Sequence, residues 1–257
     1  DAAPLLAAEG LSLRSAQGVP LLREVSLQLR PGEIVGVAGV SGNGQSELLE
    51  LLSGLHAPDA GRLRVAGEAF EAGRWLDPKR ARELGLAHVP EDRHACGLVM
   101  DFPAWESAGL GYQHLPKYRR GRFGLDGTAL RRACASMMET FDVRPRDPLL
   151  GSSKFSGGNQ QKLILAREIG EAPKVLLVGQ PTRGVDIGAI EFIHGQLRRL
   201  RDAGCAVLVV SSELDEILQL ADRVLVMNAG RITGELAIDA CDERSLGLLM
   251  VAQPEAA

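Results

Sequence analysis

The chain has 257 residues, of which 45% are apolar and 4% aromatic, and its formal net charge is −4. That length allows one sizeable core, and the small negative charge gives no reason to expect binding to nucleic acid or to an anionic membrane surface. No run approaches the ~18 consecutive apolar residues of a membrane-spanning helix, and no signal peptide opens the chain. Because the chain begins Asp1-Ala-Ala-Pro without an initiator Met, we expect a piece of a longer protein, although N-terminal processing or tag removal would look the same.

Two kinds of strand are expected along the chain. Near its beginning, Leu11–Arg14 and Val25–Leu29 alternate apolar and polar residues, as half-exposed antiparallel strands do, and residues 62–66 fit the same small sheet. From Ile34 onward, short apolar runs alternate with helix-length segments, which predicts a parallel sheet covered by helices. The expected strands of this sheet are 34–38, 86–89, 174–178, 206–210 and 223–227, and the expected helices are 46–53, 78–83, 158–169, 188–201 and 213–220.

The stretch 97–155 lacks strong strand patterns and is rich in helix-forming residues, above all over 130–141, which predicts an inserted helical subdomain. The fold class is therefore α/β, with one domain over 1–257. Within it we expect residues 8–70 to include the antiparallel β-subdomain and a phosphate loop, and residues 156–257 to complete the α/β core.

That loop is residues 39–46, Gly-Val-Ser-Gly-Asn-Gly-Gln-Ser, which has the spacing of a phosphate-binding loop with Gln where a lysine is expected. Its glycines allow successive backbone N–H groups to curl around a polyphosphate, and the helix that follows directs its positive end at the phosphates. The expected nucleotide contacts are Gly39, Ser41, Gly42, Asn43, Gly44, Gln45 and Ser46, with the Ser46 hydroxyl on Mg²⁺. Taken alone, the loop is about equally well explained as an ordinary glycine-rich strand-to-helix turn.

A second motif opens an expected helix further along the chain. Residues 154–162 read Lys-Phe-Ser-Gly-Gly-Asn-Gln-Gln-Lys, and residues 181–186 read Pro-Thr-Arg-Gly-Val-Asp after a buried strand. With the phosphate loop these motifs, in this order, resemble the ATP-binding-cassette (ABC) ATPases of sugar and nucleoside importers. The resemblance covers nearly the whole chain, from about Leu11 to Met250, and implies a P-loop NTPase fold of the ABC-ATPase type. Alone, Ser-Gly-Gly would be interpreted as a helix N-cap with permissive glycines.

In that family two cassettes dimerise head to tail, and the signature of one completes the nucleotide site of the other. The resemblance implies ATP and Mg²⁺ as cofactors, with Ser156, Gly157, Gly158, Asn159 and Asp186 as contacts. It also implies two kinds of partner, a second cassette and transmembrane permease subunits. The second cassette is expected to be the N-terminal half of the same polypeptide, and the location the cytoplasmic face of the inner membrane.

Several positions depart from the family pattern, and three of them lose a charge. Gln45 replaces the phosphate-loop lysine, Gly179 the aspartate that positions Mg²⁺, and Gln180 the glutamate that polarises water. With that aspartate absent, the Mg²⁺ contact of Ser46 is expected to be weak. A glutamine is a poor base, and losing a general base typically costs ~10²–10⁴ in rate.

Three further departures follow. Glu91 stands where the family usually has Gln, and Ser212 where a switch histidine contacts the γ-phosphate. The segment around Ser15 carries no aromatic ring to stack on adenine. We therefore expect a site that binds nucleotide weakly or not at all, in a chain that gives its signature to a partner. The substitutions favour the nucleoside branch over the ribose and galactose branches.

Alternatives remain at this point. They are a competent ATPase of a sugar importer, a soluble non-transport cassette protein, and a structural subunit that never contacts nucleotide. Phe102 and Trp105 are either exposed anchors for the permease or core residues of the insert. Asp92 and Arg93 are expected to pair with each other locally, without a chemical role.

Overall fold

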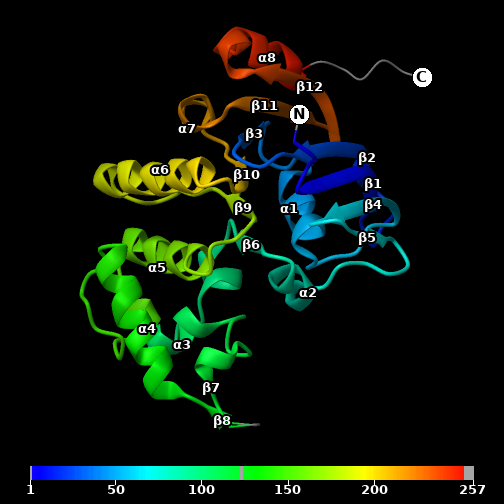
Figure 1. Ribbon diagram of the computed structural model, residues 1–257. Helices are drawn as coiled ribbons and strands as arrows, with labels where there is room; N and C mark the ends of the chain where they lie inside the picture. Colours follow the sequence, from blue (N-terminus) through cyan, green and yellow to red (C-terminus); the bar gives the residue numbers. More distant parts are fainter. Residues whose placement is uncertain (1, 122–123, 252–257) are drawn as a thin grey trace. The chain divides into compact units, whose positions relative to one another are not determined.

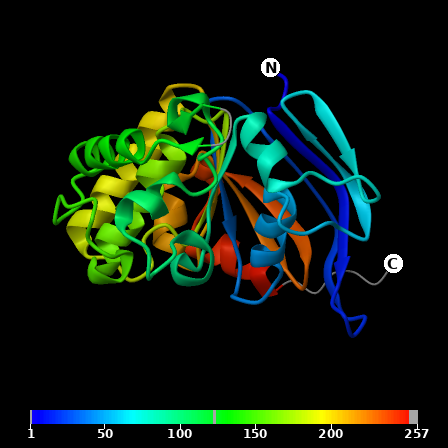
Figure 2. The same cartoon turned by 90° about the horizontal axis from the view of Figure 1, so that it is seen from below.

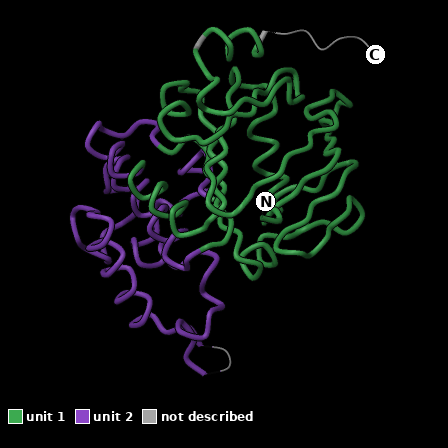
Figure 3. The backbone as a smooth tube through the Cα atoms, turned by 45° about the horizontal axis from the view of Figure 1, so that its top comes forward, with its two compact units in different colours: residues 1–88, 173–181, 194–257 green, residues 89–172, 182–193 purple. Residues whose placement is uncertain are grey.

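The computed structural model describes residues 2–121 and 124–251 (Figure 1). They divide into two compact units (Figure 3): unit 1 comprises residues 1–88, 173–181 and 194–257, and unit 2 comprises residues 89–172 and 182–193. The expected insert, 97–155, falls within unit 2, which also takes in the signature segment. Within the described ranges, none of the helices is both long enough and apolar enough to span a membrane.

Unit 1 is built on two sheets. The four-stranded antiparallel sheet has the order β2-β1-β4-β5, and the six-stranded sheet has the order β12-β11-β3-β10-β9-β6. The first sheet consists of β1 (Leu6–Arg14), β2 (Pro20–Leu29), β4 (Ala60–Val65) and β5 (Glu68–Glu71). The second consists of β3 (Ile34–Ala38), β6 (Leu86–Val89), β9 (Val175–Gly179), β10 (Ala206–Val210), β11 (Arg223–Asn228) and β12 (Arg231–Ala237).

The centre of the six-stranded sheet is parallel: β11 pairs with β3, β3 with β10 and β10 with β9, whereas β12 is antiparallel to β11. Every residue of β3, β9 and β10 is buried, as continuous apolar runs require when both faces of a sheet are covered. The expected strands are confirmed, while β12 and β5 were not anticipated.

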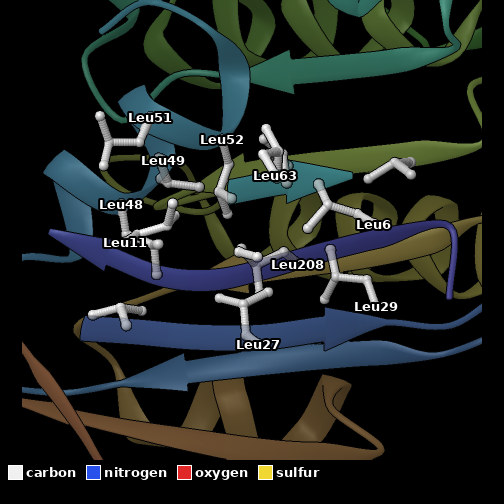
Figure 4. Close-up of a cluster of buried hydrophobic side chains, with 14 of the residues drawn as sticks. Leu6, Leu11, Leu27, Leu29, Leu48, Leu49, Leu51, Leu52, Leu63 and Leu208 are labelled. Carbon is white, nitrogen blue, oxygen red and sulfur yellow. The ribbon is translucent and has the colours of Figure 1, made fainter. Parts of the chain in front are cut away.

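One helix lies between the two sheets of unit 1. The leucines of α1 (Gln45–Ser53) belong to a single buried cluster with Leu6, Leu11 and Leu63 of the antiparallel sheet and Leu208 of the parallel sheet (Figure 4). Figure 2 shows α1 beside the antiparallel strands from below. On the opposite face of β3, a Cβ on Gly36 would lie 2.6 Å from Ile217 Cγ2 of α7 (Leu214–Leu220), so this strand position must stay a glycine for the helix to pack.

The remaining helices of unit 1 are α2 (Pro78–Glu83), the 3₁₀ turn η4 (Ile238–Ala240) and α8 (Glu243–Val251), and α6 (Ile187–Asp202) contributes residues to both units. Unit 2 contains the π-helical turn η1 (Arg93–Gly97), α3 (Ala104–Gly109), η2 (Pro116–Tyr118), β7 (Arg119–Arg120), β8 (Gly124–Leu125), α4 (Gly127–Thr140), η3 (Ser152–Lys154) and α5 (Gly157–Ile169).

A buried ion pair joins three segments of unit 2. Arg167 and Glu168, neighbours near the end of α5, have side chains only 3% and 0% exposed. Arg167 Nε donates to Glu168 Oε1 at 2.8 Å, and its Nη1 donates to the carbonyls of Gly97 at 2.7 Å and Ser107 at 3.0 Å. Tyr112 Oη donates to the other carboxylate oxygen at 2.8 Å. The network therefore fastens η1 and α3 to α5.

We expect Arg167→Met to lower the free energy of unfolding by about 3–5 kcal/mol, because it leaves a carboxylate buried without its guanidinium. Urea unfolding followed by circular dichroism measures the change. Arg132→Met, at an exposed position of α4, is the matched control and should stay within about 0.5 kcal/mol of the parent. Equal stability of the two variants would show that the buried pair does not hold unit 2 together.

Candidate functional site

Three loops of unit 1 leave the same edge of the parallel sheet. Gly39, Gln180 and Ser212 follow the carboxyl ends of β3, β9 and β10, and β10 lies between the other two strands. The carboxyl ends of parallel strands are where ligands bind in open α/β sheets. The structure therefore gathers at one edge the phosphate loop and the two positions at which a catalytic base and a switch histidine were expected.

The side chain of Gln45 bonds to the backbone of its own glycine-rich loop, residues 39–46. This side chain is buried, its Nε2 donates to Val40 O at 3.1 Å, and its Oε1 accepts from Asn43 N–H at 3.1 Å. A Cβ on Gly39 would lie 2.5 Å from Gln45 Nε2, so the amide packs directly against the first glycine. The neutral side chain thus bridges the two sides of the loop and uses one of the N–H groups that a phosphate would need.

The other residues of the loop shape its backbone or join it to a neighbouring turn. Gly42 and Gly44 have φ of +89° and +103°, which favours glycine at both positions. Asn43 joins the loop to the turn after β11, because Ala229 N–H donates to its Oδ1 and Gly230 N–H to its O, both at 3.1 Å. Ser41 is exposed. The hydroxyl of Ser46 lies in the first turn of α1.

Gln180 and Ser212 are bonded to each other. Gln180 Oε1 accepts from both the N–H and the hydroxyl of Ser212, each at 3.2 Å, and Gln180 N–H donates to Val210 O at 2.7 Å. Gln180 has φ of +47°, a left-handed conformation uncommon for a residue with a side chain. The two residues at the expected base and switch positions therefore form a neutral hydrogen-bonded pair.

The position of the expected metal aspartate carries no carboxylate. Mg²⁺ in proteins is bound through one or two carboxylates, and Gly179, where the metal aspartate was expected, carries no side chain. Over the part of the chain that the structure describes, no group of three or more His, Cys, Asp and Glu side chains is placed to hold a metal ion. The Ser46 hydroxyl is left without an acidic residue at the metal-aspartate position.

The signature segment lies in unit 2 at the start of α5. Ser156 is its N-cap: the hydroxyl accepts from Asn159 N–H at 3.4 Å and from Asn159 Nδ2 at 2.8 Å. Asn159 Oδ1 in turn accepts from Arg144 N–H at 2.7 Å. Gly157 and Gly158 form the first turn, where backbone N–H groups have no partner within the helix. The segment thus offers a hydroxyl and backbone amides at the positive end of a 13-residue helix.

Asp186 lies beside that segment within unit 2. Its Oδ1 accepts from Ala189 N–H at 2.9 Å in the first turn of α6, and a Cβ on Gly158 would lie 3.4 Å from its Oδ2. The carboxylate therefore orders the start of α6 and lies against the second signature glycine.

A hollow of about 270 Å³ opens next to these residues in unit 2. It is lined by Glu91, Asp92, Arg93, His94, Arg183 and Gly184. The expected pairing of Asp92 with Arg93 is wrong: Asp92 Oδ1 accepts from the N–H groups of His94 and Ala95, both at 2.9 Å, and these bonds lower the pKa of the Asp92 carboxyl. Arg93 instead donates to Arg183 O at 2.8 Å. Sequence reasoning gave this arginine no role, because its partner is 90 residues away.

Phe102 and Trp105, the two candidate anchors of the insert, have different environments. The Phe102 residue is 41% exposed. Trp105 is partly buried and packs against the cluster of Tyr112, Tyr118 and Leu130, with the Arg131 guanidinium 5.4 Å from its ring centroid. Only Phe102 is therefore available as an exposed anchor, and Trp105 belongs to the local core.

Sequence comparison places these features among known proteins. Over 96% of its length the chain is 42% identical to the guanosine import ATP-binding protein NupO of Bacillus subtilis. It is also 42% identical, over 96% of its length, to the nucleoside import ATP-binding protein NupA of Lactococcus lactis. A third relative, the ribose import ATP-binding protein RbsA 1 of Rubrobacter xylanophilus, is 41% identical over 95% of the chain. The chain spans about half the length of these relatives: 48%, 48% and 47%.

Solved structures share the fold. A nucleotide-free ATP-binding cassette from an ABC transporter superposes with a TM-score of 0.79 at 17% identity, covering 98% of this chain and 100% of that one. The cassette MJ0796 bound to ADP and Pi superposes with a TM-score of 0.75 at 22% identity, covering 91% of this chain and 98% of that one. These likenesses confirm the α/β P-loop fold of the ABC-ATPase type. Residues 22–183 match the ABC transporter family, to which this chain belongs.

Proposed function

We propose that this chain is the second, C-terminal cassette of a fused import ATP-binding protein and that it completes the nucleotide site of the first cassette. Its own nucleotide site is degenerate. Relatives with import function are about twice its length, which leaves room in such a protein for another cassette of similar size. In this proposal residues 97–155 are the helical insert of a single cassette.

The observation that carries the proposal is the neutral pair of Gln180 and Ser212. Phosphoryl transfer depends on positioning and on charge stabilisation. Here the base and switch positions hold an amide and a hydroxyl that satisfy each other, Gly179 supplies no metal ligand, and Gln45 brings no cation to the loop. Such a site binds ATP weakly, gains little from Mg²⁺ and does not turn over.

The signature segment keeps what the chain's own site lacks. Ser156 places its hydroxyl at the N-cap of α5, and the first-turn amides of Gly157 and Gly158 lie at the positive end of the helix. A γ-phosphate held by another cassette would find donors there and no acidic side chain among Ser156–Asn159 to repel it. The chain therefore contributes to catalysis without having a complete site of its own.

Two further parts of the proposal concern what is transported and where. Relatives named for guanosine and nucleoside import favour a nucleoside as the solute over a sugar. Permease subunits hold the chain at the cytoplasmic face of the membrane, with exposed Phe102 at the contact. No part of the proposal involves nucleic acid.

Replacing Ser156 by Arg in the two-cassette protein tests the donation. We expect ATPase activity to fall by about 10² or more, since the long side chain fills the position of the phosphate and removes the hydroxyl donor. Ser153→Arg, three residues earlier and also exposed, is the matched control and should keep at least half of the parent rate. An unchanged rate in Ser156→Arg would rule out donation.

Cysteine crosslinking tests the permease contact. With exposed Cys96 replaced by Ser, Phe102→Cys should crosslink to a permease subunit in the assembled importer, because an exposed apolar ring at the contact lies within reach of the partner. Val19→Cys, 57% exposed in unit 1, is the control and should not crosslink. Crosslinks of equal yield from both positions, or from neither, would place the contact elsewhere.

A further inference from the structure

Arg93 joins three segments of unit 2 that are distant in sequence. It begins the π-helical turn η1, and its Nη1 donates to Arg183 O at 2.8 Å in the loop 182–186. Its Nη2 lies against both of the glycines that flank it: a Cβ would be 2.8 Å from this atom on Gly157 and 3.3 Å from it on Gly184. One guanidinium therefore touches the signature segment and the loop that carries Asp186.

The absence of a side chain on Gly157 leaves room for the Arg93 guanidinium. A Cβ there would make this end of a flexible side chain shift and would also lie 3.0 Å from Gly184 O. The φ of Gly184 is +68°, so this position also favours glycine. Both glycines thus make room for a flat, multi-donor group, a shape that a lysine does not have.

Packing alone does not account for the presence of an arginine at position 93. The carboxylate of the neighbouring Asp92 accepts hydrogen bonds from the N–H groups of His94 and Ala95. Arg93 Nε is buried without a hydrogen-bond partner, which costs free energy that an apolar side chain of similar length would avoid. An arginine present at that cost, between the signature segment that the proposed function assigns to the partner's site and the loop that carries Asp186, points to a role in their geometry.

We propose that Arg93 is a positioning residue that fixes the spacing between the signature segment 156–159 and the loop 182–186. The proposal rests on the donation described above. Arg93 does not touch the nucleotide; it acts through Arg183 O and Gly157, so that Ser156 and the loop reach the partner's site in one fixed arrangement. A misplacement of these groups lowers the rate of the chemical step more than the binding of ATP.

The test compares Arg93→Met with Arg132→Met in the two-cassette protein. Arg132 is exposed on α4, outside the signature segment and the loop 182–186, and its replacement also removes one positive charge from unit 2. For Arg93→Met we expect kcat to fall about tenfold with KM for ATP changed less than about twofold. Amide hydrogen exchange in 182–186 should become about tenfold faster, as the loss of one hydrogen bond predicts. Arg132→Met should change neither quantity by more than about twofold.

Unchanged exchange in Arg93→Met would overturn the proposal, and so would a rise in KM with kcat preserved. Equal effects of the two variants would overturn it as well, since they would show that the loss of a positive charge from unit 2 is enough to produce them. Failure of the donation itself is recognised separately: Ser156→Arg would then leave the ATPase rate unchanged. Hydrogen exchange is measured without nucleotide, so it tests the positioning role of Arg93 whether or not the donation is confirmed.

Discussion

A glycine-rich loop binds phosphates through backbone N–H groups that point inward, and in this chain one of these groups, the N–H of Asn43, donates to the Gln45 side chain. Its amide donates to Val40 O and accepts from Asn43 N–H. A lysine at this position would carry a positive charge that can extend from the loop to a phosphate. The buried, neutral amide of Gln45 instead has its donor and its acceptor bonded within the loop. The loop keeps its shape, and the strand before it and α1 after it stay packed in the core of unit 1.

The same replacement of charges by neutral hydrogen bonds recurs along the sheet edge. Gln180 and Ser212 satisfy one another, and Gly179 ends β9 without a ligand for a metal. The signature segment of unit 2 shows the opposite pattern, because Ser156 and the first turn of α5 remain organised as a donor group. The chain therefore keeps a donor group at the start of α5, whereas the positions at this sheet edge where charges were expected hold neutral groups.

Much of the fold could be read from the sequence because its strongest patterns are local. The buried runs of β3, β9 and β10 are apolar without interruption, and the strand–loop–helix order around residues 39–46 fixes the phosphate-loop geometry. The edge strand β12 was missed because its residues are half-exposed and Gly234 interrupts the pattern. Its one local signal was the turn at Ala229-Gly230, where both residues have positive φ.

The contacts that give the site its character could not be read in this way. Gln180 meets Ser212 only because β9 and β10 are neighbours in the sheet, and 32 residues separate the two side chains. Arg93 reaches Arg183 across 90 residues, and its fit against Gly157 depends on the path of η1. The sequence shows that the expected charged residues are absent. The structure shows that Gln180 and Ser212, which stand at two of these positions, are hydrogen-bonded to each other.

A nucleotide titration distinguishes a degenerate nucleotide site from a competent one. ATP is titrated by calorimetry into this chain alone and into the two-cassette protein, each with Mg²⁺ and with the metal chelated. We expect the affinity of the chain alone for ATP to be lower than that of the two-cassette protein by about 10² or more, and to change less than about twofold when Mg²⁺ is removed. Binding of Mg-ATP by the chain alone as tightly as by the two-cassette protein, with turnover at an ordinary rate, would contradict it.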